Sequence, residues 1–164
     1  MKFGIISISD RCFAGEREDR SGPAISECVR ALSDSEEYRL VPDEKEMISA
    51  ALIELADEKS CDVIFTTGGT GFAPRDVTPE ATKAVIEKEV PGISEAIRAE
   101  SLKITNRAML SRAVSGIRGK TLIINLPGSP KAVRESMEIV LPVLPHAVET
   151  LSGSVQCCGG DYGK

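Results

Sequence analysis

Three short runs of residues, 3–8, 63–67 and 121–126, are rich in apolar side chains and do not alternate with polar ones. A strand with one buried face alternates, whereas a strand covered on both faces is apolar throughout. Segments with apolar residues at helical spacing stand between these runs. The alternation of buried strands with helices predicts a three-layer α/β/α sandwich around a mostly parallel sheet.

Capping and turn residues divide the rest of the chain. Residues 10–22 are polar and are predicted to form a loop, and 38–41 a further short strand. Asp43, Thr78 and Ser129 each precede a helical pattern and are predicted N-caps, Asp43 because Glu46 completes a capping box. The predicted helices cover 23–32, 43–56, 78–89, 93–102 and 130–151. Residues 105–119 fit helix and strand equally.

Size and charge narrow the class of protein. The chain has 164 residues, and we expect one domain over 1–151 and a flexible tail over 152–164 that contains Cys157-Cys158. A net charge of −5 disfavours binding of nucleic acid. No apolar run approaches the length of a membrane span and the first residues do not form a signal peptide, so we expect a cytoplasmic protein without membrane contact. Five cysteines without C-x-x-C spacing predict neither disulfides nor a zinc site.

A glycine-rich segment, Thr66-Thr67-Gly68-Gly69-Thr70-Gly71, follows the second apolar run and is itself followed by Arg75-Asp76. Glycines let backbone N–H groups surround an anion, and threonine hydroxyls add donors and acceptors. The segment lacks the Lys-Ser/Thr ending of a P-loop and the glycine spacing of a dinucleotide site. It predicts a phosphate site; the alternatives are a tight turn with Asp76 as a turn residue and Arg75 as a solvated surface charge.

Other polar residues stand where ligands bind in such folds, beyond the carboxyl ends of strands. Asp43 and Asp76 could hold one Mg²⁺ against phosphates if their strands are neighbours, although a helix cap also explains Asp43. Asp10 follows the first strand and is either a ligand contact or part of a polar turn. Asn125 ends a buried strand and needs partners, from the Pro127–Ser129 corner or from a ligand.

Taken together, several segments resemble one family, the molybdopterin adenylyltransferases, which include stand-alone bacterial enzymes and the G domains of gephyrin and of the plant molybdenum-insertion protein. The resemblance covers about residues 3–151 and is carried by Ser7-Ile8-Ser9-Asp10-Arg11, Pro42-Asp43-Glu44, Thr67–Gly71 with Arg75–Thr82, Glu100–Lys103, Ala108–Arg112, Gly116–Gly119 and Leu122–Gly128.

The resemblance implies a reaction and a homotrimer. The terminal phosphate of molybdopterin attacks the α-phosphate of ATP with Mg²⁺, giving adenylylated molybdopterin and pyrophosphate. Asp43 and Asp76 correspond to the family's two essential aspartates and are the expected catalytic and metal-binding residues. The expected nucleotide and phosphate contacts are Thr67, Gly68, Gly69, Thr70, Gly71 and Arg75, and the expected pterin contacts are Ser111, Asn125, Pro127 and Gly128. A separate molybdenum-insertion protein is a candidate downstream partner.

Two departures from the family pattern concern the pterin side. The corner is Pro127-Gly128-Ser129-Pro130 rather than Pro-Gly-Asn-Pro or Pro-Gly-Gln-Pro, and Thr105-Asn106-Arg107 replaces a eukaryotic Thr-Pro-Phe. Two other functions stay open: a molybdopterin-binding module or paralogue without adenylyl transfer, and a general nucleotide-binding or scaffolding domain. Retention of Asp43, Asp76 and Ser111 together favours the enzyme.

Overall fold

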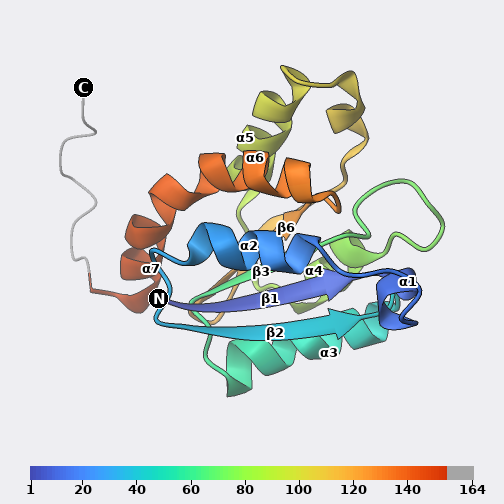
Figure 1. Cartoon of the computed structure of the whole chain (residues 1–164). Coiled ribbons are helices and arrows are strands. Elements are labelled where there is room, and N and C mark those ends of the chain that lie inside the picture. Colours follow the sequence, from blue (N-terminus) through green and yellow to red (C-terminus); the bar gives the residue numbers. More distant parts are fainter. Residues whose placement is uncertain (155–164) are drawn as a thin grey trace.

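A six-stranded sheet with helices on both faces forms the molecule, in a computed structural model that describes residues 1–154 (Figure 1). The strand order is β2-β1-β3-β6-β5-β4. The strands are β1 (Lys2–Ile8), β2 (Ser35–Val41), β3 (Val63–Thr67), β4 (Lys88–Glu89), β5 (Ser115–Arg118) and β6 (Thr121–Leu126). Four are parallel, and β5 and β4 continue the sheet, with β5 antiparallel to β6 and β4 antiparallel to β5. The predicted three-layer fold with a mostly parallel sheet is confirmed.

The helices cover the two faces of the sheet as the apolar strands require. One face packs against α2 (Ser21–Val29), α5 (Pro91–Leu102), α6 (Pro130–Val140) and α7 (Leu144–Ser152). The other packs against α3 (Lys45–Ile53), a π-helical turn η1 (Glu54–Glu58) and α4 (Thr78–Val85). Along β1, Phe3 and Ile5 belong to the first core and Ile6 and Ile8 to the second, because successive side chains in a strand point to opposite faces.

Several element boundaries differ from the predictions. The expected loop over 10–22 contains a short helix, α1 (Asp10–Phe13). The helix that begins at Thr78 ends at Val85, and the chain then forms β4 before α5 begins at Pro91. The unassigned segment 105–119 holds a 3₁₀ turn, η2 (Asn106–Leu110), followed by β5. The last predicted helix is divided into α6, a 3₁₀ turn η3 (Leu141–Val143) and α7, because prolines interrupt it.

One of the three predicted caps is confirmed. Ser129 caps α6, and its Oγ accepts a hydrogen bond from the backbone N–H of Ala132. The cap predicted at Asp43 is wrong, because α3 begins after Glu44 and the Asp43 carboxylate bonds elsewhere. The cap predicted at Thr78 is also wrong: Thr78 is the first residue of α4 and its hydroxyl donates to the carbonyl of Gly68, 2.8 Å away.

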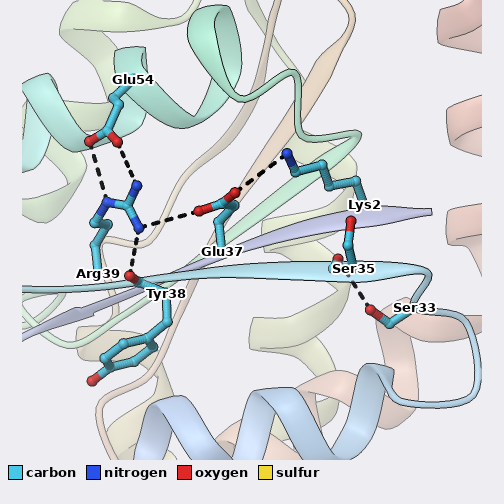
Figure 2. A network of polar contacts seen from close by, with 7 residues as sticks. All are labelled: Lys2, Ser33, Ser35, Glu37, Tyr38, Arg39 and Glu54. Carbon is cyan, nitrogen blue, oxygen red and sulfur yellow. Dashed lines mark hydrogen bonds and ion pairs between the residues drawn. The ribbon is translucent and has the colours of Figure 1, made fainter.

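Charged side chains line the edge strand β2 (Figure 2). Arg39 donates to both carboxylate oxygens of Glu54 on η1 and to Glu37, and Lys2 of β1 lies 3.5 Å from Glu37. Charges on an edge oppose pairing with another strand. Among residues 1–154, no helix is long and apolar enough to cross a membrane. The predicted tail with Cys157-Cys158 lies outside the described residues.

Candidate active site

A polar cavity of about 240 Å³ lies at the carboxyl ends of the parallel strands. This edge of the sheet carries α1 and the long loop that follows β3 (Figure 1). The lining includes residues from the ends of β1, β2 and β3 and from the corner after β6, among them Ser7, Asp43, Gly68, Gly69, Asp76 and Gly128. The cavity is therefore where ligands bind in open α/β sheets.

The glycine-rich segment turns sharply at Gly68 and Gly69, both of which have positive φ, 99° and 63°. A Cβ at Gly68 would lie 2.2 Å from the carbonyl oxygen of Ile8, closer than any real contact. The segment is also tied to the corner after β6, because the Thr67 hydroxyl donates to the Pro127 carbonyl over 2.7 Å. Glycine is thus required at 68 by both backbone conformation and space.

Asp43 and Asp76 both line this cavity, and both carboxylates lie close to the glycine-rich segment. A Cβ on Gly69 would lie 3.0 Å from Oδ1 of Asp43, and a Cβ on Gly71 would lie 2.9 Å from Oδ2 of Asp76. The condition expected for this meeting, that their strands be neighbours, is wrong, since β1 lies between β2 and β3. The loops meet across the end of β1 instead.

Asp10, the first residue of α1, fixes the Asp43 loop through a reciprocal pair of hydrogen bonds. The Asp10 N–H donates to Oδ2 of Asp43 over 2.9 Å, and the Asp43 N–H donates to Oδ1 of Asp10 over 3.0 Å. The Arg75 guanidinium donates to both carboxylate oxygens of Asp10, from Nε over 3.0 Å and from Nη2 over 2.9 Å. Its Nη1 lies 2.8 Å from Oε1 of Glu44. Asp10 is thus part of a structural junction that joins three loops.

The ionisation of these carboxyls follows from their surroundings. The pKa of Asp43 is raised, first by burial and then by the nearby charges of Asp10 and Asp76, while the hydrogen bond from the Asp10 N–H and the charge of Arg75 oppose this rise. The pKa of Asp10 is lowered, chiefly by its hydrogen bond from Arg75. A bound cation beside Asp43 would relieve the repulsion between these carboxylates.

Arg112 binds the last residues of the glycine-rich segment and the loop that follows it. Its backbone N–H donates to the Thr70 carbonyl over 2.9 Å, and its guanidinium donates to the carbonyls of Gly71 and Asp76 over 2.7 and 2.5 Å. It also pairs with Glu80. No local pattern singles out Arg112, because all these partners are distant along the chain. Its neighbour Ser111 is half-buried and accepts a hydrogen bond from the Ala113 N–H.

Asn125 is fully buried, and its partners differ from those expected. Its amide nitrogen donates to the hydroxyls of Thr66 and Thr82, both at 2.9 Å, and its amide oxygen accepts from the Val114 N–H. Neither the Pro127–Ser129 corner nor a ligand is needed to satisfy it. Both amide hydrogens are already used, so Asn125 is well suited to hold the Val114 segment in place.

Asp19 is a site residue that the sequence analysis missed. Its carboxylate lines the polar cavity and accepts from the Ser7 hydroxyl at 2.6 Å and the Tyr38 hydroxyl at 2.7 Å. It also accepts from the N–H groups of Ser21 and Gly22 at the start of α2. Burial acts to raise the pKa of Asp19, and these hydrogen bonds outweigh burial and lower it. Burial, together with the bond to Asp19, raises the pKa of Tyr38 to about 12.

A second cavity of about 280 Å³ lies between α5, η2 and the corner after β6. Thr70 and Pro127 line this cavity, while their neighbours Gly69 and Gly128 line the polar one, so one wall separates the two. The predicted pterin contacts are divided between them. Ser111, Asn125 and Pro127 line the second cavity and Gly128 the polar one.

Two carboxylates of the polar cavity, Asp43 and Asp76, are the candidate metal ligands. Within residues 1–154 no cluster of three His, Cys, Asp or Glu side chains could hold a metal ion. Mg²⁺ in proteins is commonly held by one or two carboxylates together with water and substrate phosphates, so the pair Asp43 and Asp76 fits that ion. Oδ2 of Asp43 and Oδ2 of Asp76 accept backbone N–H groups of Asp10 and Ala73, which fixes both carboxylates.

Comparison with known proteins places the chain in a family. Residues 4–146 match the family model described as "Probable molybdopterin binding domain". Among similar proteins, a molybdopterin adenylyltransferase of Helicobacter pylori J99 is 49% identical, over 92% of this chain and 88% of that protein. A molybdopterin adenylyltransferase of Escherichia coli K12 is 46% identical, over 84% and 72%.

A solved structure agrees with these relatives. The structure described as the molybdopterin biosynthesis enzyme MoaB of Thermus thermophilus superposes with a TM-score of 0.85 at 50% identity, over 93% of this chain and 96% of that one. Sequence and fold therefore agree, and the chain belongs to the molybdopterin-binding domain family.

Proposed function

We propose that this chain is a molybdopterin adenylyltransferase of molybdenum cofactor biosynthesis. The terminal phosphate of molybdopterin attacks the α-phosphate of ATP, the bond to the β-phosphate breaks, and adenylylated molybdopterin and pyrophosphate leave. Relatives that carry this name at 46–49% identity support the proposal. The observation that carries it is the placement of Asp43 and Asp76 beside the glycine-rich segment in one polar cavity.

The proposed chemistry needs positioning and charge compensation more than a covalent nucleophile. The attacking phosphate is already ionised, so no histidine base is required. Thr67 and Gly68–Gly71 would hold the nucleotide phosphates through hydroxyl and backbone N–H groups. Arg75 was expected to contact phosphate, and that contact stays a prediction; its pairing with Asp10 and Glu44 supports a role in holding the loop.

Asp43 and Asp76 would be the catalytic carboxylates and would hold Mg²⁺. When bound, Mg²⁺ supplies positive charge that offsets the charge on the α-phosphate and on the departing pyrophosphate. The raised pKa of Asp43 supports this assignment, because a carboxylate destabilised by burial and by neighbouring negative charges is stabilised by a bound cation. On the pterin side, Ser111, Pro127 and Gly128 would contact the substrate, and Asn125 would position the segment beside it.

We further propose that the chain forms a homotrimer, acts in the cytoplasm and passes its product to a molybdenum-insertion protein. Exposed hydrophobic side chains on and around α5 and η2, among them Leu102, Ile104 and Met109, provide apolar surface for assembly. Light scattering on the full chain measures the oligomer, and a mass other than three chains overturns the trimer.

The test of function is turnover by the purified full chain given molybdopterin, ATP and Mg²⁺. We expect pyrophosphate release together with one adenylylated pterin for each molybdopterin consumed. Tight binding of molybdopterin without pyrophosphate release would instead identify a binding module that lacks adenylyl transfer. A variant of Glu46, an exposed α3 residue, to Gln serves as the control and should retain full turnover.

A further inference from the structure

The second cavity has largely apolar walls, formed by side chains such as Ile97, Ile104, Ala108, Leu110 and Ala113. It adjoins the polar cavity across the glycine-rich segment, so a flat ring there would leave an attached phosphate near that segment. Apolar walls with a few polar groups are typical of sites for small heterocyclic ligands, and the polar groups set their specificity.

Three polar side chains of this cavity are already engaged within the protein. The Asn125 amide bonds to Thr66, Thr82 and Val114. The hydroxyls of Ser94 and Ser115 bond to each other, and Arg98 donates to the Ala113 carbonyl over 2.8 Å. The other polar side chains that line the cavity, apart from Glu135, are hydroxyls and the Arg107 guanidinium, and none of these is a charged acceptor.

Glu135 is different, because it is the one carboxylate among the described residues that line this cavity. It lies on α6, one turn after Ala132, which lines the same cavity. Its side chain is 30% exposed, and its ion pair with Lys131 is a distant 3.7 Å contact to a side chain that is 81% exposed. Such a surface pair contributes little and leaves the carboxylate oxygens able to accept from a ligand.

We propose that Glu135 binds the pterin ring of molybdopterin through the adjacent N3–H and 2-amino group. These two parallel donors match the two oxygens of a carboxylate, as the donors of a guanidinium do. Glu135 thereby selects a 2-amino-4-oxopteridine over a ring with oxygen at position 2, which would place an acceptor against the carboxylate. The inference rests on the proposed function and adds the residue that recognises the substrate ring.

The test compares the wild type with Glu135→Gln, and with Glu138→Gln as a control on an exposed position of the same helix. Fluorescence titration with molybdopterin should give a Kd about 10- to 100-fold higher for Glu135→Gln, the loss expected for a charged hydrogen-bonded pair. The Glu138→Gln variant should bind as the wild type does, and the KM for ATP should be unchanged in both. A Glu135→Gln Kd within about twofold of wild type overturns the inference, since a lost charged contact exceeds that change.

A second measurement uses only the wild-type protein and so does not depend on folding of the variant. 6-Hydroxymethylpterin should displace molybdopterin at least about 10-fold better than 6-hydroxymethyllumazine, which has oxygen in place of the 2-amino group. Equal displacement by the two rings overturns the assignment of Glu135. A wild type that fails to bind molybdopterin at all contradicts the proposed function itself, which separates the two failures.

Discussion

Asp43 shares its surroundings with two other carboxylates, Asp10 and Asp76, and with one cation, Arg75. Burial and the two negative charges raise its pKa, and the hydrogen bond from the Asp10 N–H and the charge of Arg75 partly oppose them. To hold a metal ion, Asp43 must be ionised. Activity should therefore fall as the pH drops through the pKa of Asp43, and any change that removes positive charge nearby should move this fall to higher pH.

The Arg75→Ala substitution tests this electrostatic balance. It removes the cation that lowers the pKa of Asp43, so the acidic limb of the profile of kcat/KM against pH should move to higher pH. The matched control is Arg134→Ala, which removes an arginine of α6 that pairs with Glu27 of α2 rather than with Asp10 or Glu44. An acidic limb that stays in place in Arg75→Ala would show that Arg75 does not act on the ionisation of the site.

Single residues also mark the limit of sequence reasoning. The pattern from Asp43 to Glu46 has the form of a capping box, yet the Asp43 carboxylate accepts from the Asp10 N–H instead. Thr78 likewise donates to Gly68 rather than capping α4. Ser129, whose partner is three residues away, was predicted correctly. Contacts within one turn can be read from sequence, whereas contacts between loops depend on the strand order.

At the scale of elements, the turn after β3 depends on glycine for two separable reasons. Gly68 has positive φ and packs against the backbone of Ile8, whereas Gly15 has positive φ in open space. Both positions disfavour a side chain through backbone conformation, but only Gly68 adds a steric overlap with backbone that cannot move aside.

Alanine at these two positions should separate conformational cost from overlap. Gly15→Ala should lower the free energy of unfolding by about 1 kcal/mol, the cost of positive φ for a residue with a Cβ. Gly68→Ala should lower it by at least about 3 kcal/mol, because overlap is added to that strain. Urea denaturation measures both values. Equal losses at the two positions would mean that the close approach to Ile8 is unimportant.

Asp19 connects three elements, β1 through Ser7, β2 through Tyr38 and the start of α2 through two N–H groups. We expect Asp19→Ala to lower the free energy of unfolding by about 2 kcal/mol, since it removes the acceptor of two N–H groups at the start of α2 and leaves buried donors unpaired. Glu18→Ala, at a side chain that is 77% exposed, should change stability by less than about 0.5 kcal/mol.

The effect of Asp19 should depend on pH in a definite direction. The folded-state pKa of Asp19 is lowered, so its stabilisation is present above the ordinary value of 3.8 and is lost as the pH falls through the folded pKa. The difference in stability between wild type and Asp19→Ala should therefore shrink in acid. A difference that is constant from neutral pH into acid would contradict the role given to the ionised carboxylate.

The elements themselves were predictable where burial dictates composition. The runs 3–8, 63–67 and 121–126 lie in the middle of the sheet and are apolar because helices cover both faces. Residues 105–119 could not be assigned because they form a 3₁₀ turn and a four-residue strand, β5, too short to show a period. The positions of β4 and β5 in the sheet are set by tertiary packing, and the local sequence pattern does not predict them.

For the whole molecule, the strand order brings the loops after β1, β2, β3 and β6 to one edge. Asp10, Asp43, Gly69, Asp76 and Gly128 thus line or border one polar cavity although they are spread over most of the chain. The residue types and the edge were predictable from the sequence, and resemblance supplied their roles. The contacts of Arg75 with Asp10 and Glu44, of Arg112 with Gly71 and Asp76, and of Asp19 with Ser7 form only when these loops meet. They could not be predicted from the local sequence pattern.

The central claim is that Asp43 and Asp76 together perform adenylyl transfer in this cavity, and the most direct measurement is product formation by their conservative variants. Asp43→Asn and Asp76→Asn should be compared with wild type by mass spectrometry of adenylylated molybdopterin at saturating ATP, Mg²⁺ and molybdopterin. We expect both variants to fold and to bind molybdopterin as the wild type does, while product formation falls by at least about 100-fold, the cost of losing a ligand that stabilises the transition state. Product formation at the wild-type rate by either variant would contradict the account.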